Sequence, residues 1–272
     1  MKIPEQYQEY INEFIDVLSQ DENVDLSIFN NNLQSLQIMV EDNNENYPAG
    51  YNRHNNTIRL KNDESISSIY HELLHVASTK IEDELIYSGV SQEVIETKLV
   101  LGLGLTEGIT EYLREQYFGI QNKSDYFLEK FYVRQLLGLV SEKSIKTSYF
   151  TADNEEFLNE LLKYASFDEI KRFLYNLDIY TISMQHPESA DIENIQEAIT
   201  SCTDFLITAY YNKLNIINGE AASEKMEEYI DGFNMYIVEP SLNNQEFILL
   251  PSKDALIKIN VLKQVDNNSK AI

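Results

Sequence analysis

The sequence predicts an α+β fold that is mostly helical. Two observations carry this expectation: apolar residues recur at helical spacing over most of the chain, and strand-like runs are short and lie towards its two ends. The 272 residues, 43% of them hydrophobic, supply enough apolar material for a core. We expect an N-terminal lobe of helices and strands at residues 1–120 and a mainly helical C-terminal lobe with short terminal strands at residues 121–272.

Helical and strand-like segments alternate in the N-terminal part. Apolar residues at helical spacing predict a first helix over residues 5–19. Short runs at residues 35–40 and 57–61 predict strands. The polar segment at residues 53–56, directly before the second of these runs, predicts a turn.

The chain from residue 125 to residue 230 reads as mostly helical. The segments 153–166 and 191–211 open with acidic residues, which favour a helix N-terminus, and continue with apolar residues at helical spacing. Between residues 232 and 265 the runs FNMYIV, EFILL and ALIKINVL predict strands, separated by proline and asparagine.

The chain is strongly acidic, with 45 acidic and 21 basic residues and a formal net charge of −24. This charge repels nucleic-acid phosphates and anionic lipids, so we expect neither a nucleic-acid nor a membrane partner. A basic or neutral partner fits better, and a solvated acidic surface that favours solubility is the simplest interpretation.

Cysteine usage and the N-terminus bear on the compartment. The single cysteine, Cys202, excludes an internal disulfide and a cysteine-based metal cluster within one chain. The stretch MKIPEQYQEYINEF carries acids and a proline where a secretory signal needs an apolar core, and no later run approaches membrane-spanning length. These features predict a cytoplasmic protein, while export without a cleaved signal stays open.

Two of the four histidines lie in the stretch YHELLHVAS, at His71 and His75. Apolar residues at steps of three and four place this stretch in a helix that begins near Ser65 and that Asp63 or Ser65 could cap at its start. Positions i and i+4 share one helix face, so the two imidazoles can converge on one point, with Glu72 beside it.

Two imidazoles and a carboxylate suit Zn²⁺ and leave a fourth position for water. A zinc ion lowers the pKa of its bound water, and a neighbouring carboxylate can take up the water's proton. The alternative is two histidines that decorate a helix face and bind no metal.

A second segment, LGLTEGITEYL, supplies two more carboxylates. It begins a helix near Thr106 that Gly119 is placed to end, and Glu107 and Glu111 again lie at i and i+4. One carboxylate could therefore bind the ion while the other supports a ligand.

The two segments together resemble the gluzincins, the zinc metallopeptidases that include thermolysin, over about residues 57–119. The resemblance implies a zincin-like pair of active-site helices, which makes residues 1–120 the catalytic lobe, with Zn²⁺ bound by His71, His75 and Glu107. It makes Glu72 the general base and Glu111 the acidic residue that supports a ligand histidine. A carboxylate in that supporting role fixes the tautomer of the imidazole.

The third ligand has two competitors in the segment at residues 80–105, which we expect to form a hairpin or loop over the cleft. Glu93 and Glu96 are closer to His75 along the chain, at a spacing nearer to that usual in gluzincins. We favour Glu107 because its helix also supplies Glu111 as a supporting group.

The gluzincin resemblance also implies a group that stabilises the oxyanion and a strand that pairs with an extended peptide. Tyr87 and His186 are the candidates for the first role, although a packing or surface role is the simpler account of each. Residues 57–60 are the candidate for the edge strand, although a purely structural strand fits them equally well.

The sequence therefore predicts a zinc-dependent hydrolase, most simply a metallopeptidase with a peptide or protein substrate. The alternatives are a non-catalytic zinc-binding interaction or regulatory protein with the same fold, and a hydrolase with a non-peptide substrate.

Overall fold

The computed structural model describes residues 3–40, 49–61, 68–120, 126–217 and 221–259. Its fold is α+β and mostly helical, as predicted. The chain divides into two compact units, the first formed by Met1–Arg134 with Ser141–Phe157 and the second by Gln135–Val140 with Leu158–Ile272. The first unit thus extends beyond residue 120, and the catalytic role that we gave to this part of the chain stays a prediction.

The first unit contains the helices and strands that the N-terminal patterns predict. The predicted helix at residues 5–19 is present, as are the two strands and the turn at residues 53–56. The predicted start of the helix near Ser65, with its cap at Asp63 or Ser65, lies outside the described residues. The elements are α1 (Glu5–Leu18), α2 (Ser27–Leu33), β1 (Gln37–Val40), β2 (Ala49–Asn52), β3 (Thr57–Leu60), α3 (Ile69–Ser78), β4 (Thr79–Glu82), β5 (Leu85–Ser88), β6 (Ser91–Val94), β7 (Leu99–Leu101), α4 (Leu103–Phe118), α5 (Phe127–Leu136) and α6 (Glu142–Thr151). The last two residues of α5 belong to the second unit.

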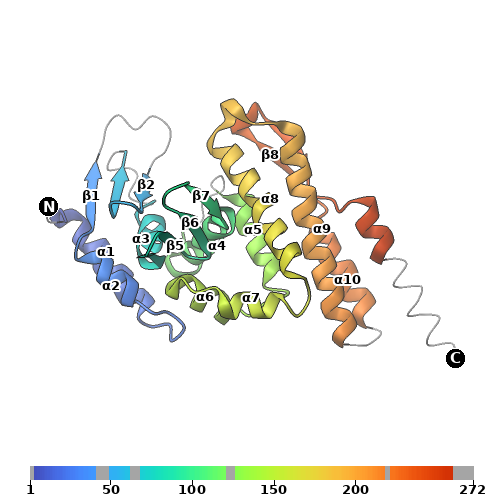
Figure 1. Cartoon of the computed structure of the whole chain (residues 1–272), viewed down its shortest axis with the longest axis horizontal. Coiled ribbons are helices and arrows are strands. Elements are labelled where there is room, and N and C mark those ends of the chain that lie inside the picture. Colours follow the sequence, from blue (N-terminus) through green and yellow to red (C-terminus); the bar gives the residue numbers. More distant parts are fainter. Residues whose placement is uncertain (1–2, 41–48, 62–67, 121–125, 218–220, 260–272) are drawn as a thin grey trace. The chain divides into compact units, whose positions relative to one another are not determined.

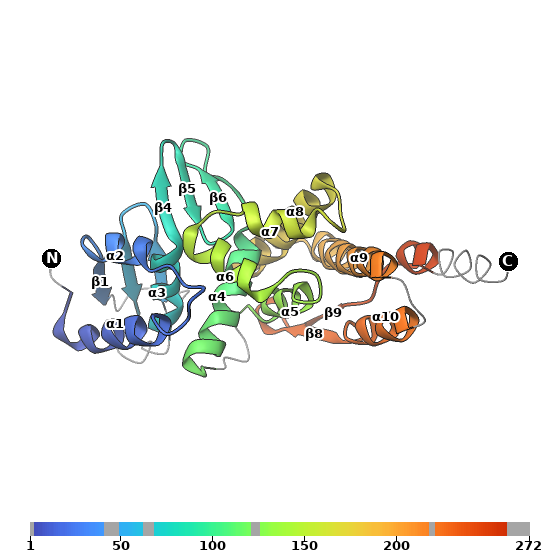
Figure 2. The same cartoon turned by 90° about the horizontal axis from the view of Figure 1, so that it is seen from below.

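The strands described in this unit form two small sheets. In the first sheet the order is β1-β3-β2, with β3 parallel to β1 and antiparallel to β2. The expectation that residues 57–60 are an edge strand is therefore wrong: β3 is hydrogen-bonded on both sides, and β2 is an edge of this sheet. The segment between α3 and α4, expected to be a hairpin or loop, is the antiparallel sheet β4-β5-β6-β7 (Figure 2).

Helix α3 lies in the core of the first unit, and all ten of its residues are buried. It packs against α1, α2, α4, α6, β2 and β5, and Figure 1 shows it between the first sheet and α4. Tyr70 ties it to two neighbours: its ring stacks on Phe118 of α4 at 4.1 Å, and its hydroxyl donates to Glu13 of α1. A helix so enclosed can hold polar side chains at fixed positions away from bulk water.

Helix α4 is bounded by two glycines and packs closely on α5. Gly102 and Gly119 have φ of 87° and 66°, values that favour glycine, and Gly119 ends the helix as predicted. A Cβ atom on Gly108 would lie 2.5 Å from the carbonyl oxygen of Glu129 in α5. Only glycine allows this approach, which sets the position of the turn that carries Glu107.

The described part of the second unit is helical with one hairpin, and the long helices α8 and α9 pack side by side (Figure 1). Ser166 and Glu169 form a capping box at the start of α8. The elements from α7, where the division falls, to the hairpin are α7 (Glu155–Leu161), α8 (Phe167–Gln185), the 3₁₀ turn Pro187–Ser189, α9 (Ile192–Ile217), α10 (Ala221–Asp231), β8 (Tyr236–Glu239), the 3₁₀ turn Pro240–Leu242 and β9 (Gln245–Ile248).

The C-terminal run ALIKINVL is not a strand where it is described. Residues 253–259 are helical, and Ala255 and Ile259, four residues apart, are buried. The hydroxyl of Ser252 accepts from the backbone N–H of Ala255 and begins this turn, a capping contact that outweighs the β propensity of the isoleucines. The strands predicted from FNMYIV and EFILL are present as β8 and β9.

Candidate metal centre

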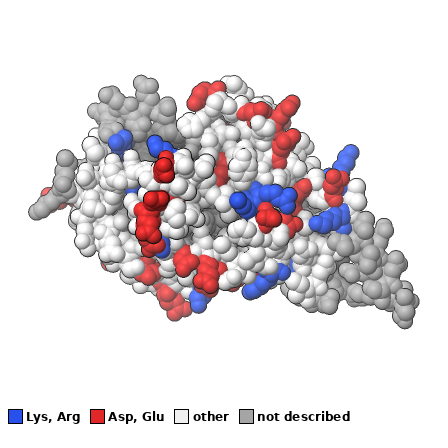
Figure 3. All heavy atoms as spheres, in the orientation of Figure 1, with Lys and Arg blue, Asp and Glu red and all other residues white. Residues whose placement is uncertain are grey.

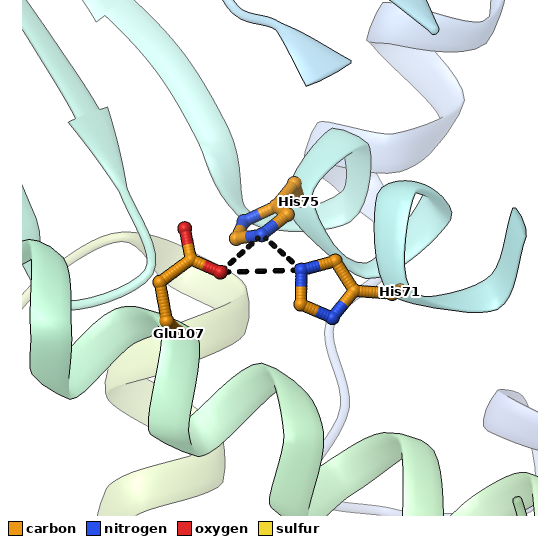
Figure 4. Close-up of side chains that lie close together, drawn as sticks. All are labelled: His71, His75 and Glu107. Atoms are coloured by element: carbon orange, nitrogen blue, oxygen red, sulfur yellow. Dashed lines mark hydrogen bonds and ion pairs between the residues drawn. The ribbon is translucent and has the colours of Figure 1, made fainter. Parts of the chain in front are cut away.

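Helices α3 and α4 bring three metal-binding side chains to one point (Figure 4). The Nε2 atoms of His71 and His75 lie 3.0 Å apart. Each is 3.2 Å from the same carboxylate oxygen of Glu107. All three residues are buried, and among the described residues this is the group of histidine, cysteine and carboxylate side chains that could hold a metal ion.

The spacing of these donor atoms fits a small tetrahedral ion. Two ligands at the usual zinc distances of about 2.0–2.1 Å and a tetrahedral angle are roughly 3.3 Å apart. The three observed separations are 3.0, 3.2 and 3.2 Å. An ion could thus lie slightly outside the plane of the three atoms, with a fourth position open, after only small side-chain movements.

The Nδ1 atom of His71 is held by Glu111, at 2.6 Å from one carboxylate oxygen. The other oxygen of Glu111 accepts from Arg114 at 2.6 Å, and both side chains are buried. With Nδ1–H donated to Glu111, the Nε2 atom of His71 faces His75 and Glu107. This is the contact expected of a group that orients a ligand histidine.

Glu72 is buried beside the three donor atoms, close enough for the charges of His71, His75 and Glu107 to act on it. Its carboxylate accepts a hydrogen bond from the backbone N–H of Tyr51 in the edge strand β2. Burial raises the pKa of Glu72 above its ordinary value, although the two histidines and this hydrogen bond oppose the rise. The backbone of β2 thus anchors a carboxylate that is easier to protonate than a solvated one.

Burial and hydrogen bonding act in opposite directions on the pKa of His71. Burial lowers it, but the hydrogen bonds to Glu107 and Glu111 and the charge of Glu72 outweigh burial and raise the pKa from 6.5 to about 10. For Glu107 burial favours the neutral form, yet the two histidines hold its pKa well below the usual range. In the metal-free site His71 therefore carries protons on both ring nitrogens at neutral pH, and a metal ion must displace one of them to bind.

Glu93 and Glu96, the alternative candidates for the third ligand, do not belong to this group of donor atoms. Glu93, on β6, is buried and pairs with Arg53 at 2.8 Å and with His54 at 3.3 Å. Glu96 is exposed in the turn between β6 and β7. Among the described residues neither belongs to the group that could hold a metal ion, and Glu107 does.

The two oxyanion candidates have ordinary surroundings. Tyr87, on β5, lies opposite Lys80 in the sheet, and the Lys80 ammonium sits 5.2 Å from the centre of its ring. His186 follows α8 in the second unit, with its side chain 60% exposed and 3.6 Å from Glu188. The oxyanion role stays a prediction for both residues.

Three contributors to the centre were missed by sequence reasoning. Arg114 follows Glu111 by three residues, a spacing that indicates an ion pair and could have suggested the contact. The ring of Tyr126 stacks on that of His71, with the ring centres 5.6 Å apart and an angle of 10° between the planes. Tyr126 lies outside both of the segments that supply the metal-binding side chains, so their patterns did not indicate it. The amide of Tyr51 contributes through the backbone, so no side-chain pattern could reveal it.

A search with this chain against models of protein families, curated proteins and solved structures found no match. Within the described residues, no helix is both long enough and apolar enough to span a membrane. The chain has a buried group of two histidines and one glutamate that could hold a metal ion.

Proposed function

We propose that the protein is a zinc-dependent hydrolase that cleaves peptide bonds, with the metal and base arrangement of a gluzincin. One observation carries the proposal: two imidazole nitrogens and a carboxylate oxygen converge within 3.2 Å, while Glu111 holds the far nitrogen of His71. His71, His75 and Glu107 would hold the ion. Their donor set, two nitrogens and one oxygen with an open fourth position, suits a reactive zinc site more than a structural one.

The bound ion would lower the pKa of a water molecule and polarise the carbonyl group of the substrate. Glu72 would accept a proton from the attacking water and pass it to the leaving amine. The hydrogen bond from Tyr51 restrains the Glu72 carboxylate, and Glu111 keeps His71 in the tautomer that presents Nε2. Burial of the whole group limits competing contacts with bulk water.

A peptide or protein substrate fits the surroundings of the site. Strand β2 is an edge of its sheet and also contacts the proposed base, so an extended peptide could lie along it. The net charge of −24 argues against nucleic acid or anionic lipid as the substrate.

The test compares three zinc-loaded proteins: the wild type, Glu72→Gln and the control Glu96→Gln. Each is assayed for bound zinc and for cleavage of a panel of unstructured polypeptides. Glu96 is exposed, and its substitution removes the same charge without touching the site. We expect all three to hold zinc, and we expect Glu72→Gln to cleave more slowly by a factor of roughly 10² to 10⁴.

Two outcomes would contradict the proposal. If Glu72→Gln cleaves as fast as the wild type, or if a chelator leaves cleavage unchanged, the mechanism is wrong. If the wild type binds zinc and cleaves nothing in the panel, the protein is better described as a non-catalytic zinc-binding module.

A further inference from the structure

The hairpin of the second unit, β8 with β9, has one covered edge and one open edge. The covered edge belongs to β9, which packs on α9. There the side-chain amide of Gln196 accepts a hydrogen bond from the backbone N–H of Ile248 at 3.0 Å and donates one to its carbonyl oxygen at 2.9 Å. Gln196 thus takes the place that a third strand would occupy beside β9.

The register of the hairpin shows where the backbone groups of β8 point. Opposed residues of an antiparallel pair alternate between pairs that exchange two hydrogen bonds and pairs that exchange none. Ile248 directs both of its backbone groups to α9, so its pair with Tyr236 is of the second kind. The pair of Val238 with Glu246, two residues along, follows the same pattern. The N–H and carbonyl groups of Tyr236 and Val238 therefore point away from β9.

Further observations agree that this edge is open. The N–H of Leu249 donates to the carbonyl oxygen of Met235 at 3.2 Å, as the alternation requires of the neighbouring pair. Among the described residues, no segment other than β9 hydrogen-bonds to the backbone of Tyr236 or Val238. Figure 2 shows β8 on the side of β9 that faces away from α9. The edge thus offers backbone donors and acceptors to an added strand.

The side chains at this edge form an apolar outer face. Tyr236 is 65% exposed and Val238 is 49% exposed, and Ile248 and Leu250 on the other side of the hairpin are exposed as well. A hairpin of two strands is marginally stable, and stable sheets have three or more strands with an apolar face. An added strand would extend both the ladder of β8 and this face.

The surroundings of the hairpin are acidic. Residues 236–250 contain Glu239 and Glu246 and no lysine or arginine. Residues 191–197, at the start of α9, contain three acids and again no lysine or arginine. The whole chain carries −24, and Figure 3 shows groups of acidic side chains over the face that it displays. These charges attract a basic segment and repel a second copy of this chain.

We propose that the open edge of β8 binds an extended segment of a partner protein in which apolar residues alternate with lysine or arginine. The backbone of this segment would hydrogen-bond to Tyr236 and Val238, and such bonds supply the affinity in recognition by strand addition. Its apolar side chains would continue the outer face. Its basic side chains would lie on the other face, which on β8 carries Glu239. The proposal concerns the second unit and does not depend on the proposed hydrolase activity.

The test measures binding of a peptide by the full-length protein. The probe is Lys-Val-Lys-Val-Lys-Val-Lys-amide with a fluorophore on its N-terminus, and fluorescence anisotropy gives the dissociation constant. One matched peptide has Glu in place of each Lys. The other keeps the side chains and has every backbone amide N-methylated, so that it cannot donate to a strand. All proteins carry Glu72→Gln, so that the proposed hydrolase does not consume the probe.

Two variants alter the edge of β8. Val238→Pro removes an outward N–H and no hydrogen bond of the hairpin, and Val238→Lys places a charge on the edge. The control Leu99→Lys makes the same charge change at an exposed apolar residue of β7, an edge strand of the first unit.

We expect the probe to bind about tenfold more tightly than either matched peptide, as suits the loss of charge attraction or of backbone hydrogen bonds. Both Val238 variants should lose about tenfold in affinity for the probe, and Leu99→Lys should lose none. Thermal unfolding checks that the variants keep the fold. The peptide comparison uses the unaltered edge, so it decides the matter even where a variant disturbs the hairpin.

The proposal is wrong if the Lys and Glu peptides bind equally, or if the N-methylated peptide binds as tightly as the probe. It is also wrong if both Val238 variants retain the binding, or if Leu99→Lys weakens it as much as Val238→Lys does. A dimer in sedimentation experiments that Val238→Pro dissociates would show that a second copy occupies the edge instead. Failure of the proposed function gives a different result: the probe binds as expected while the wild type cleaves no polypeptide.

Discussion

The two units differ in what their interiors contain. Among the described residues, the first unit buries histidines, carboxylates and cations, whereas Asp178 is the buried charged side chain of the second. The interior of the second unit is otherwise mainly aliphatic and aromatic, as at Phe173, Leu177 and Leu206. Both units form helices from the same kinds of apolar periodicity.

This difference places the side chains that could hold a metal ion in the first unit. Burying an ionisable group costs free energy unless the group is paired. A cluster of buried ionisable groups is therefore weak evidence for a contribution to folding stability. In the observed arrangement, His71, Glu107, Glu111 and Arg114 are paired with one another through ion pairs and hydrogen bonds. That arrangement is also the one that could hold a metal ion.

The largest effect should come from Glu107→Ala, because it removes one of three donors. We expect zinc affinity to fall by more than the roughly 10- to 100-fold that the loss of a supporting group costs. Competition with a chelator of known affinity gives the measurement, and Glu96→Ala is the control. Retention of zinc by Glu107→Ala together with its loss from Glu96→Ala would show that the third ligand is misassigned.

A smaller effect should follow from Glu111→Gln, which keeps the shape of the side chain but weakens its hold on His71. We expect a loss of roughly 10- to 100-fold in zinc affinity. Asp178→Asn is the matched control, since it neutralises the buried carboxylate of the second unit and should leave zinc affinity unchanged. Equal effects of the two substitutions would remove the contrast between the units.

Gly108→Ala tests the close packing of α4 on α5 that positions Glu107. The added methyl group would lie 2.5 Å from a backbone oxygen, so we expect the free energy of unfolding to fall by about 1–3 kcal/mol or more. Denaturant titration measures the change, and Gly50→Ala, where a Cβ meets no atom within 4 Å, is the control. Comparable stability of the two variants would mean that the helices can separate without cost.

The smallest effect concerns pH. Because the pKa of His71 is about 10 in the metal-free protein, zinc uptake near pH 7.5 should release about one proton from it. Zinc affinity should then rise about tenfold per pH unit through neutrality. Calorimetry in buffers of different ionisation enthalpy counts the protons released on zinc binding. Release of no proton would show that His71 is already neutral in the metal-free protein.

The same pKa fixes the sign of a stability change in the metal-free protein. His71 has a folded-state pKa above its unfolded value of about 6.5, so its contribution to stability is complete below that pH. The contribution is lost as pH rises through about 10. Melting temperatures of chelated protein should therefore decline over this interval, and a rise would contradict the assignment.

Much of the fold was predictable because its periodicities are local. The helix at residues 5–19, the end of α4 at Gly119 and the hairpin strands β8 and β9 follow from apolar spacing and turn residues. The predictions that failed depended on partners. Residues 253–259 are helical through a contact of Ser252, and β3 is central because β1 and β2 both pair with it.

The sequence by itself determined the type and spacing of the metal-binding side chains. His71 and His75 on one helix, and Glu107 and Glu111 on another, follow from the i, i+4 geometry of helices. Only the tertiary structure decided that these helices pack together, so that three donor atoms come within 3.2 Å and Glu93 pairs with Arg53 instead. The physical reason is that helix periodicity is a local property of the chain, whereas convergence depends on close packing between segments distant in sequence, such as that at Gly108.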